Sequence, residues 1–394
     1  MPSPLNSPAL CRLSRPALIC PLGDNLEEIA RALFHGQRKF SVSDRFTPGR
    51  PLPLGMVNSR LPDPSVWPAR HRSRNNQLLA AALAQLQPDI DALRLRQPAA
   101  RIGIVLGTST SGIGETERAL ASRKGDQWPA DFHYQRQEIG APSEFLAEFL
   151  AADGPAHTLS TACTSSAMAL ASAYRLLASD TCDAVIAGGA DSLCGLTVNG
   201  FSSLEALSDS ECQPFSQHRR GINLGEAAAL FLVTREAGGT QLTGYGESSD
   251  AHHFSAPHPA GAGAIAAMRS ALRMAHCNPA DVSYLNLHGT ATRQNDSMEA
   301  LAVHQVFGAD LPCSSTKALT GHTLGACGAL EAAFCWLALN GARLPPHIND
   351  GHTDPDLPSL NYALAGPLEG ARAMSNSFAF GGNNIALLLE RIDG

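Results

Sequence analysis

The stretch His157-Thr-Leu-Ser-Thr-Ala-Cys163-Thr-Ser-Ser-Ala167 decides the fold. Residues 157–162 have the composition of a short strand, and residues 165–178 are rich in Ala, Leu, Met and Tyr, which favours a helix. The cysteine lies at the junction of the two, at the carboxyl edge of the expected sheet, where α/β proteins place ligands. The unpaired N–H groups of a helix N-terminus favour a thiolate there. A single cysteine is more often a buried packing residue, so the stretch alone only suggests a reactive thiol at Cys163.

Apolar runs and helical segments alternate on both sides of this stretch, which is typical of α/β organisation. We expect strands at 102–106, 184–187, 227–233, 282–287, 312–315, 374–377 and 385–390, and helices at 25–35, 76–93, 263–275, 296–307 and 324–339. Gly188-Gly189 is expected to stop the strand before it. Asp296 and Glu299 have the spacing of a helix capping box. The pattern divides near residue 240 into two halves.

The composition excludes several classes of protein. The 394 residues include 29 Lys+Arg and 36 Asp+Glu, and the net charge of −7 gives no basic surface for a nucleic acid. Charged residues are 16%, where about 25% is usual, which suggests buried or subunit-covered surface. No apolar run approaches the roughly 20 residues of a membrane span, and the start lacks a signal-peptide core. We therefore expect a soluble, cytoplasmic protein.

The ten cysteines do not form a recognisable metal or redox motif. None of them has Cys-x-x-Cys spacing, which argues against a zinc knuckle or a thioredoxin-type site. His252, His253 and His258 have no Cys or Glu partner at useful spacing, so no metal site is predicted. Nine of the cysteines are interpreted as small buried hydrophobic residues.

Three further motifs follow expected strands. They are His288-Gly-Thr-Ala-Thr292, Ser314-Ser-Thr-Lys317-Ala-Leu-Thr-Gly-His322 and Asn376-Ser-Phe378-Ala-Phe380-Gly-Gly-Asn-Asn384. Alone, each histidine is more often a packing residue. Together with Cys163 they indicate a nucleophilic thiolate beside two imidazoles and a backbone oxyanion hole, a set suited to acyl transfer through a thioester.

With these motifs the sequence resembles the β-ketoacyl-[acyl-carrier-protein] synthases, decarboxylating condensing enzymes of the thiolase superfamily. Further matching stretches, in family order, are Ala187-Gly-Gly-Ala-Asp191, Pro214-Phe215, Gly225-Glu226 and Ser248-Ser-Asp250. The resemblance implies an α/β fold, a five-layered α-β-α-β-α sandwich of two similar halves. We expect residues 1–240 to carry the nucleophile and residues 241–394 to carry the two histidines. A homodimer is usual, and a heterodimer with a related ketosynthase-like chain remains open.

The resemblance also implies roles for individual residues. Cys163 takes the acyl chain from an acyl carrier protein, while His288 and His322 bind the malonyl thioester carbonyl and promote loss of CO2. The N–H groups of Cys163 and Phe380 form the oxyanion hole, and Phe380 gates the site. Lys317 adds positive charge near His322, and Glu299 is the family's buried acid. The remaining candidates are Phe378 in a supporting role and Thr290, Thr292 and Phe201 in substrate binding. No cofactor is called for, because the carrier protein brings the phosphopantetheine arm.

Two alternatives stay open at this point. A chain-length-factor-like subunit keeps the fold but usually loses the cysteine, which is retained here. A thiolase normally pairs its nucleophile with one His and a second Cys, whereas this chain has two histidines.

The sequence departs from the family pattern at two places. Ser216 and Arg220 replace Asp, and Ile222 replaces Phe, in the loop that shapes the pocket mouth. Residues 132–138 replace a Pro/Phe-rich segment. These changes favour a non-standard acyl group, such as an aryl or polyene chain.

Overall fold

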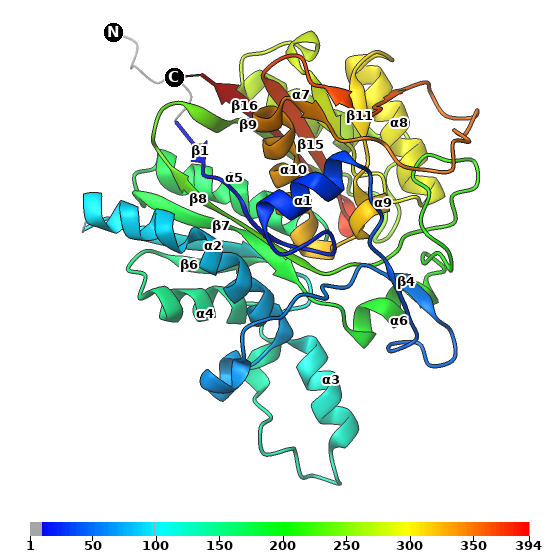
Figure 1. Cartoon of the computed structure of the whole chain (residues 1–394). Coiled ribbons are helices and arrows are strands. Elements are labelled where there is room, and N and C mark those ends of the chain that lie inside the picture. Colours follow the sequence, from blue (N-terminus) through cyan, green and yellow to red (C-terminus); the bar gives the residue numbers. More distant parts are fainter. Residues whose placement is uncertain (1–9, 98, 394) are drawn as a thin grey trace.

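The computed structural model describes residues 10–97 and 99–393, and its centre is a 12-stranded sheet (Figure 1). The sheet consists of two parts with the same strand pattern. In the first part, β6 (Ala156–Leu159), β5 (Ile102–Gly107) and β7 (Ala184–Asp191) run parallel, and β8 (Ala227–Thr234) is antiparallel to β7. In the second, β11 (Pro312–Ser314), β10 (Tyr284–Asn286) and β15 (Arg372–Phe378) run parallel, and β16 (Asn383–Ile392) is antiparallel to β15. The two halves are therefore similar in topology, as expected.

A short strand near the N-terminus joins the two parts. β1 (Arg12–Leu13) pairs with β8 on one side and with β9 (Gly239–Ser249) on the other, and β9 continues the second part through β16. β2 (Ala17–Ile19) also pairs with β8. The hydrogen bonds of β1 make one continuous sheet from two halves, which the sequence pattern did not indicate.

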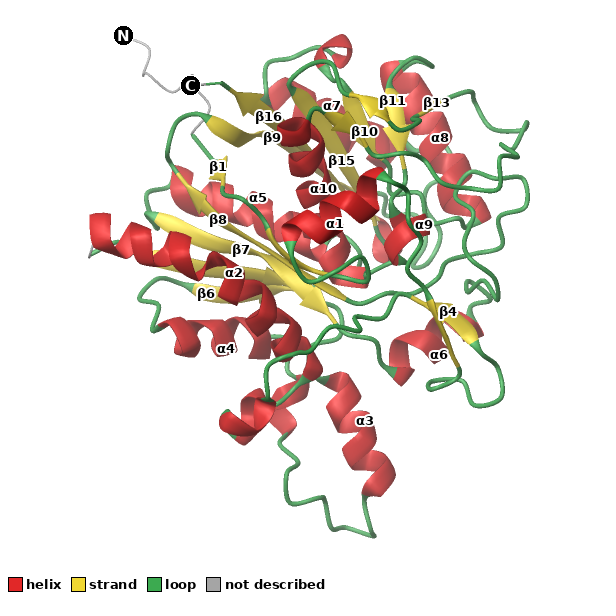
Figure 2. Ribbon diagram, in the orientation of Figure 1, coloured by secondary structure: helices red, strands yellow, loops and turns green. Residues whose placement is uncertain are grey.

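The helices form three layers around the two parts of the sheet (Figure 2). α5 (Ser165–Ala178) and α10 (Cys327–Gly341) lie between them and share one buried core with the inner sheet faces. α2 (Arg74–Arg96) and α4 (Ala141–Leu150) cover the outer face of the first part, and α7 (Ala262–Met274) and α8 (Arg293–Phe307) cover that of the second. These layers confirm the predicted α-β-α-β-α sandwich.

The remaining elements are short. They are α1 (Leu26–Phe34), α3 (Ile113–Ser122), α6 (Gly195–Ser203), α9 (Lys317–Thr320), and the two small sheets of β3 (Ser41–Ser43) with β4 (Leu52–Leu54) and of β12 (Arg343–Leu344) with β14 (Gly366–Pro367); β13 (Asn361–Tyr362) pairs with β11 at the edge of the main sheet. α3 and the loop after it extend away from the body of the molecule (Figure 2).

The prediction that Gly188-Gly189 ends a strand is wrong, since β7 continues to Asp191. A Cβ at Gly188 would lie 2.0 Å from the carbonyl oxygen of Ala229 on β8, and one at Gly189 would lie 2.3 Å from that of Gly107 on β5. The two glycines allow neighbouring backbones to approach closely, a role that strand interiors also give to glycine.

The central helix α10 is unusually apolar. Together with the turn before it, Leu324–Gly341 has the length and hydropathy of a membrane span, although no run of that kind was expected. It is 83% buried inside the fold, between the two parts of the sheet. Its composition is that of a core helix, because it packs against other elements on all sides.

Candidate active site

Cys163 lies in the tight turn between β6 and α5. Ala162 has a φ of 53°, a left-handed conformation that non-glycine residues rarely adopt. The hydroxyl of Ser165 stabilises the turn by accepting a hydrogen bond from the N–H of Thr161 and donating one to the carbonyl of Ala162. The thiol is thus presented at the N-terminus of a central helix and at the carboxyl edge of the sheet.

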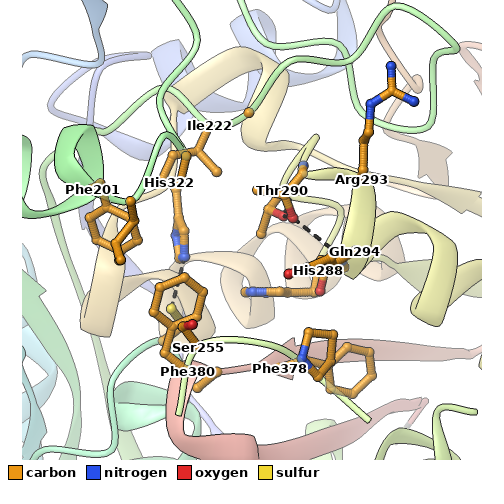
Figure 3. A pocket seen from close by; sticks show the side chains of 18 of the residues that line it. Phe201, Ile222, Ser255, His288, Thr290, Arg293, Gln294, His322, Phe378 and Phe380 are labelled. Carbon is orange, nitrogen blue, oxygen red and sulfur yellow. Dashed lines mark hydrogen bonds between the residues drawn. The ribbon is translucent and has the colours of Figure 1, made fainter. Parts of the chain in front are cut away.

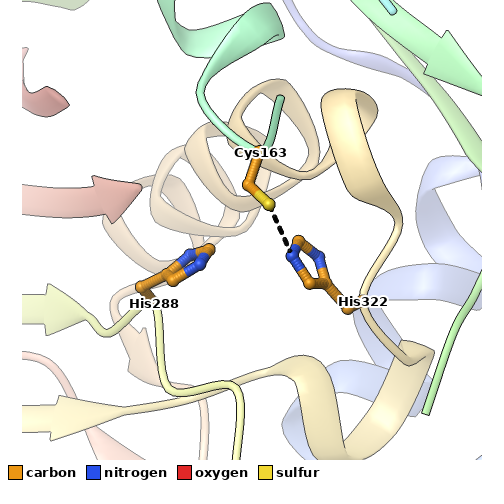
Figure 4. Close-up of side chains that lie close together, drawn as sticks. All are labelled: Cys163, His288 and His322. Carbon is orange, nitrogen blue, oxygen red and sulfur yellow. Dashed lines mark hydrogen bonds between the residues drawn. The ribbon is translucent and has the colours of Figure 1, made fainter. Parts of the chain in front are cut away.

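Two histidines from the second half approach the thiol (Figure 4). His322, in the turn after α9, lies with its Nε2 3.0 Å from Sγ of Cys163. His288 follows β10, and its ring centroid is 5.3 Å from that of His322, nearly perpendicular to it. The prediction that these three side chains come together is therefore matched by the geometry.

Burial controls protonation at this site. It raises the pKa of Cys163 to about 12, although the positive charge of Lys317 and the N–H of Phe380 act in the opposite direction. Desolvation of the anion therefore opposes the thiolate that the helix end was expected to favour. Burial, and then the charge of Lys317, hold the pKa values of His288 and His322 well below the usual range, so both imidazoles are neutral.

Lys317 stands behind His288 in the protein interior. Its Nζ is 3.2 Å from Nδ1 of His288 and 2.5 Å from a carboxylate oxygen of Glu331, and its side chain is 2% exposed. Burial disfavours the ammonium, but the Glu331 carboxylate outweighs it and raises the pKa of Lys317. Lys317 therefore contacts His288 and Glu331 directly, while its charge also acts on His322, near which it was expected.

Glu299 holds the backbone that carries His288. Its two carboxylate oxygens accept hydrogen bonds of 2.7 Å from the N–H groups of His288 and Gly289. The capping box predicted with Asp296 is wrong, because α8 begins at Arg293 and the hydroxyl of Thr292 caps it. Both acidic side chains instead point back to loops that a sequence pattern does not connect to them.

The side chains of Cys163, His288 and His322 line a cavity of about 560 Å³. Figure 3 shows the side chains around it. Of the predicted site residues, Cys163, His288, His322, Thr290, Thr292, Phe201, Phe378 and Phe380 line it, whereas Lys317 and Glu299 lie behind the wall. The rings of Phe201 and Phe380 are 5.5 Å apart at one side. Arg220 and Ile222, noted as departures from the family pattern, belong to the same wall.

The architecture is that of a known family. A family model described as "Beta-ketoacyl synthase, N-terminal domain" matches residues 17–238, and one described as "Beta-ketoacyl synthase, C-terminal domain" matches residues 240–350. The chain belongs to the β-ketoacyl synthase family. The predicted resemblance is confirmed.

Curated members of the family are similar over most of their length. The 3-oxoacyl-[acyl-carrier-protein] synthase 2 of Staphylococcus aureus (strain COL) is 31% identical over 345 residues, covering 82% of this ketosynthase chain and 83% of the relative. The enzyme of the same name from Synechocystis sp. is 29% identical over 402 residues, covering 95% and 96%.

Solved structures agree with this ketosynthase fold. A chain of the ketosynthase (ApeO) and chain length factor (ApeC) complex from Xenorhabdus doucetiae is 46% identical, with a TM-score of 0.91 and coverage of 99% of this chain and 100% of that one. A chain of the ishigamide ketosynthase/chain length factor is 27% identical, with a TM-score of 0.90 and coverage of 98% and 100%.

Two residues of the ketosynthase site were missed from sequence. Glu331 lies on the apolar helix α10. A single acidic residue within an apolar helix was the sequence signal that could have identified it. Asp191, at the end of β7, accepts hydrogen bonds from the hydroxyls of Thr108 and Thr110 and from the N–H of Gly325. It was quoted within a motif but given no role; the structure shows that it ties the strand ends of the first half to the turn before α10.

Proposed function

We propose that this chain is the catalytic subunit of a β-ketoacyl-[acyl-carrier-protein] synthase, with Cys163 as the residue that carries the growing acyl chain. The observation that carries the proposal is the 3.0 Å contact between Sγ of Cys163 and Nε2 of His322 at the floor of the cavity. The family is one of condensing acyltransferases, and its members elongate acyl chains in fatty-acid or type II polyketide synthesis.

The loading step follows from the protonation states. The thiol is protonated at rest, so Nε2 of the neutral His322 accepts the proton as sulfur attacks the carbonyl carbon of the incoming thioester. The bond from that carbon to the sulfur of the phosphopantetheine arm then breaks, and the arm's sulfur leaves with the proton. The N–H groups of Cys163 and Phe380 are the proposed donors to the oxyanion.

The condensation step uses His288 as a hydrogen-bond donor. The ammonium of Lys317 donates to Nδ1 of His288, which fixes the neutral tautomer with its proton on Nε2. Nε2–H of His288 binds the carbonyl oxygen of the malonyl thioester, and His322 donates to the same oxygen in the tautomer that carries its proton on Nε2. Loss of CO2 leaves an enolate on which negative charge develops at that oxygen, and the enolate carbon attacks the acyl carbon on Cys163. The bond from that carbon to Sγ of Cys163 then breaks, and the released thiolate takes up a proton from solvent to restore the thiol. Thr290 and Thr292, joined by a 3.0 Å hydrogen bond between their hydroxyls, are the proposed contacts for the arm.

A β-ketoacyl synthase activity requires protein partners. An acyl carrier protein delivers both substrates, and a second ketosynthase-like chain, identical or related, covers part of the surface. Apolar side chains exposed around α3 and α4 are consistent with such a subunit; they are Leu120, Trp128, Tyr134, Ile139 and Phe149. The retained cysteine and histidines favour the catalytic partner over a chain-length-factor role. We place the protein in the cytoplasm and its internal boundary at residue 240.

The acyl group is proposed to be non-standard, as in an aryl or polyene chain. Ile222 and Arg220 in the wall of the cavity, where the family pattern has Phe and Asp, support a changed pocket mouth.

Intact-mass measurement with a panel of acylated carrier proteins tests the proposal. We expect one acyl group on the wild type, none on Cys163→Ala, and unchanged loading on Cys327→Ala. Cys327 is a matched control, because its thiol lies 3.1 Å from the carbonyl oxygen of Cys163 and is equally buried. Loading that persists in Cys163→Ala would contradict the assignment, and the preferred donor would name the acyl class.

A further inference from the structure

Two loops meet at the surface beside the cavity mouth and bring together two histidines and an aspartate. His218 belongs to the loop 216–222, whose end lines the cavity, and His352 and Asp350 belong to the loop before residue 354. Each of the three offers one possible ligand atom, and these atoms lie within 4.8 Å of one another. His218 lies more than 130 residues before Asp350 and His352 in the sequence, so the fold brings it to the other two.

Asp350 orients both imidazole rings. Nδ1 of His218 lies 2.7 Å from a carboxylate oxygen of Asp350, and Nδ1 of His352 lies 2.9 Å from the backbone carbonyl oxygen of the same residue. Nδ1 of His352 also lies 3.8 Å from the carboxylate oxygen that faces His218, so the two Nδ1 atoms and this oxygen can share one ion in place of the bridging proton. A neutral imidazole can bind a metal ion through either Nδ1 or Nε2. The ring centroids are 5.1 Å apart.

The backbone beneath the cluster is fixed. The N–H of Gln217 donates to the carbonyl of His352 (3.0 Å), and Ser216 and Thr353 form an antiparallel bridge. The buried guanidinium of Arg219 pairs with Asp354 at 2.5 Å. Tetrahedral coordination at about 2.0–2.2 Å needs ligand atoms roughly 3.4 Å apart. Because the three side chains are exposed, small rotations of them on this fixed backbone can reach that spacing.

We propose that His218, Asp350 and His352 bind one divalent transition-metal ion of the zinc class, with water completing the coordination. Imidazole nitrogens with one carboxylate are ligands that Zn²⁺ prefers. The ion links the loop 216–222 to the loop 349–354 at the rim of the cavity, and so stiffens the wall that contains Arg220 and Ile222. This inference does not depend on the reaction proposed above.

Calorimetric titration of the tag-free, chelator-treated protein with ZnCl2 tests the site. Zinc can also bind the buried group of Cys163, His288 and His322, so every variant is measured in the Cys163→Ala background. We expect one zinc equivalent in that background and at least about tenfold weaker binding after His218→Ala or His352→Ala. His252→Ala and His258→Ala are the matched controls, since those rings are also 5.1 Å apart but belong to no three-ligand group among the residues described.

Co²⁺ gives a second readout that does not depend on folding stability. We expect visible absorption bands of tetrahedral Co²⁺ that disappear in His218→Ala and His352→Ala and remain in the two controls. In a separate measurement, zinc should raise the melting temperature of the parent protein. Zinc binding equal in all variants, or lost entirely in the Cys163→Ala background, would overturn the proposal.

Discussion

Replacing Lys317 by Met separates the structural part of its role from the chemical part. Lys317 and Glu331 are both at most 3% exposed and form an ion pair, so removal of the ammonium leaves a buried carboxylate without its partner. Breaking such a pair costs about 3–5 kcal/mol. With an unfolding entropy of about 2.1 cal/mol/K per residue, roughly 0.8 kcal/mol/K for this chain, the melting temperature should fall by about 4–6 °C.

The pH dependence of that loss has a definite sign. Burial raises the pKa of Glu331 to about 7, and Lys317 keeps it from rising further. In Lys317→Met the carboxyl group should therefore be neutral over a wider range. A group with a raised acid pKa contributes stability at low pH and loses it as the pH rises through the folded-state pKa. The deficit in melting temperature should accordingly shrink below pH 7 and grow above it.

The double variant Lys317→Met/Glu331→Gln decides between the two roles. Without a buried charge it should recover most of the melting temperature. Its kcat should stay about 10²–10⁴-fold below the wild type, because no donor holds Nδ1 of His288. Melting curves and carrier-protein condensation kinetics on the three proteins measure both. Recovery of kcat together with stability would refute the positioning role, and an unchanged melting temperature in the single variant would refute the buried ion pair.

Three further outcomes are expected. Alkylation of Cys163 by iodoacetamide, followed by peptide mass, should accelerate about tenfold per pH unit from pH 6 to 9, since burial holds its pKa near 12; a plateau near pH 8.5 would contradict this. Glu299→Gln places an amide N–H donor against a backbone N–H donor of the His288 loop. We expect kcat to drop about tenfold or more, with a modest loss of stability. Unchanged kinetics would show that the carboxylate is not needed. Gly107→Ala puts a Cβ 2.2 Å from the N–H nitrogen of Ser166 on α5, so we expect little soluble protein or a displaced Cys163 with slow acyl loading; a wild-type loading rate would count against this close packing.

Much of the site could be predicted from sequence because its residues follow apolar runs. Cys163, His288, Lys317 and His322 each come directly after an expected strand or in the turn that follows it. Within each half, parallel strand order brings those ends to one edge of the sheet. The packing of the two halves around α5 and α10 then brings the two edges together.

The parts that could not be predicted depend on contacts between distant segments. Gly188 looked like a strand end in the sequence. The reason for a glycine there is the close approach of the β8 backbone, which exists only in the folded chain. Glu299 looked like a capping residue, since the backbone donors it binds come from the preceding strand end. The pKa of Cys163 is set by burial, which a local helix-end argument does not include.

The most direct test is the carbon–carbon bond itself. The protein, with any partner that copurifies, is mixed with its preferred acyl carrier protein substrate and malonyl-carrier protein labelled with ¹³C in the free carboxyl group. We expect one β-ketoacyl product and one labelled CO2 for each acyl group consumed, with no β-ketoacyl product from Cys163→Ala. Equal product from Cys163→Ala, or acyl-Cys163 that is never elongated, would contradict a condensing enzyme that works through this thiol.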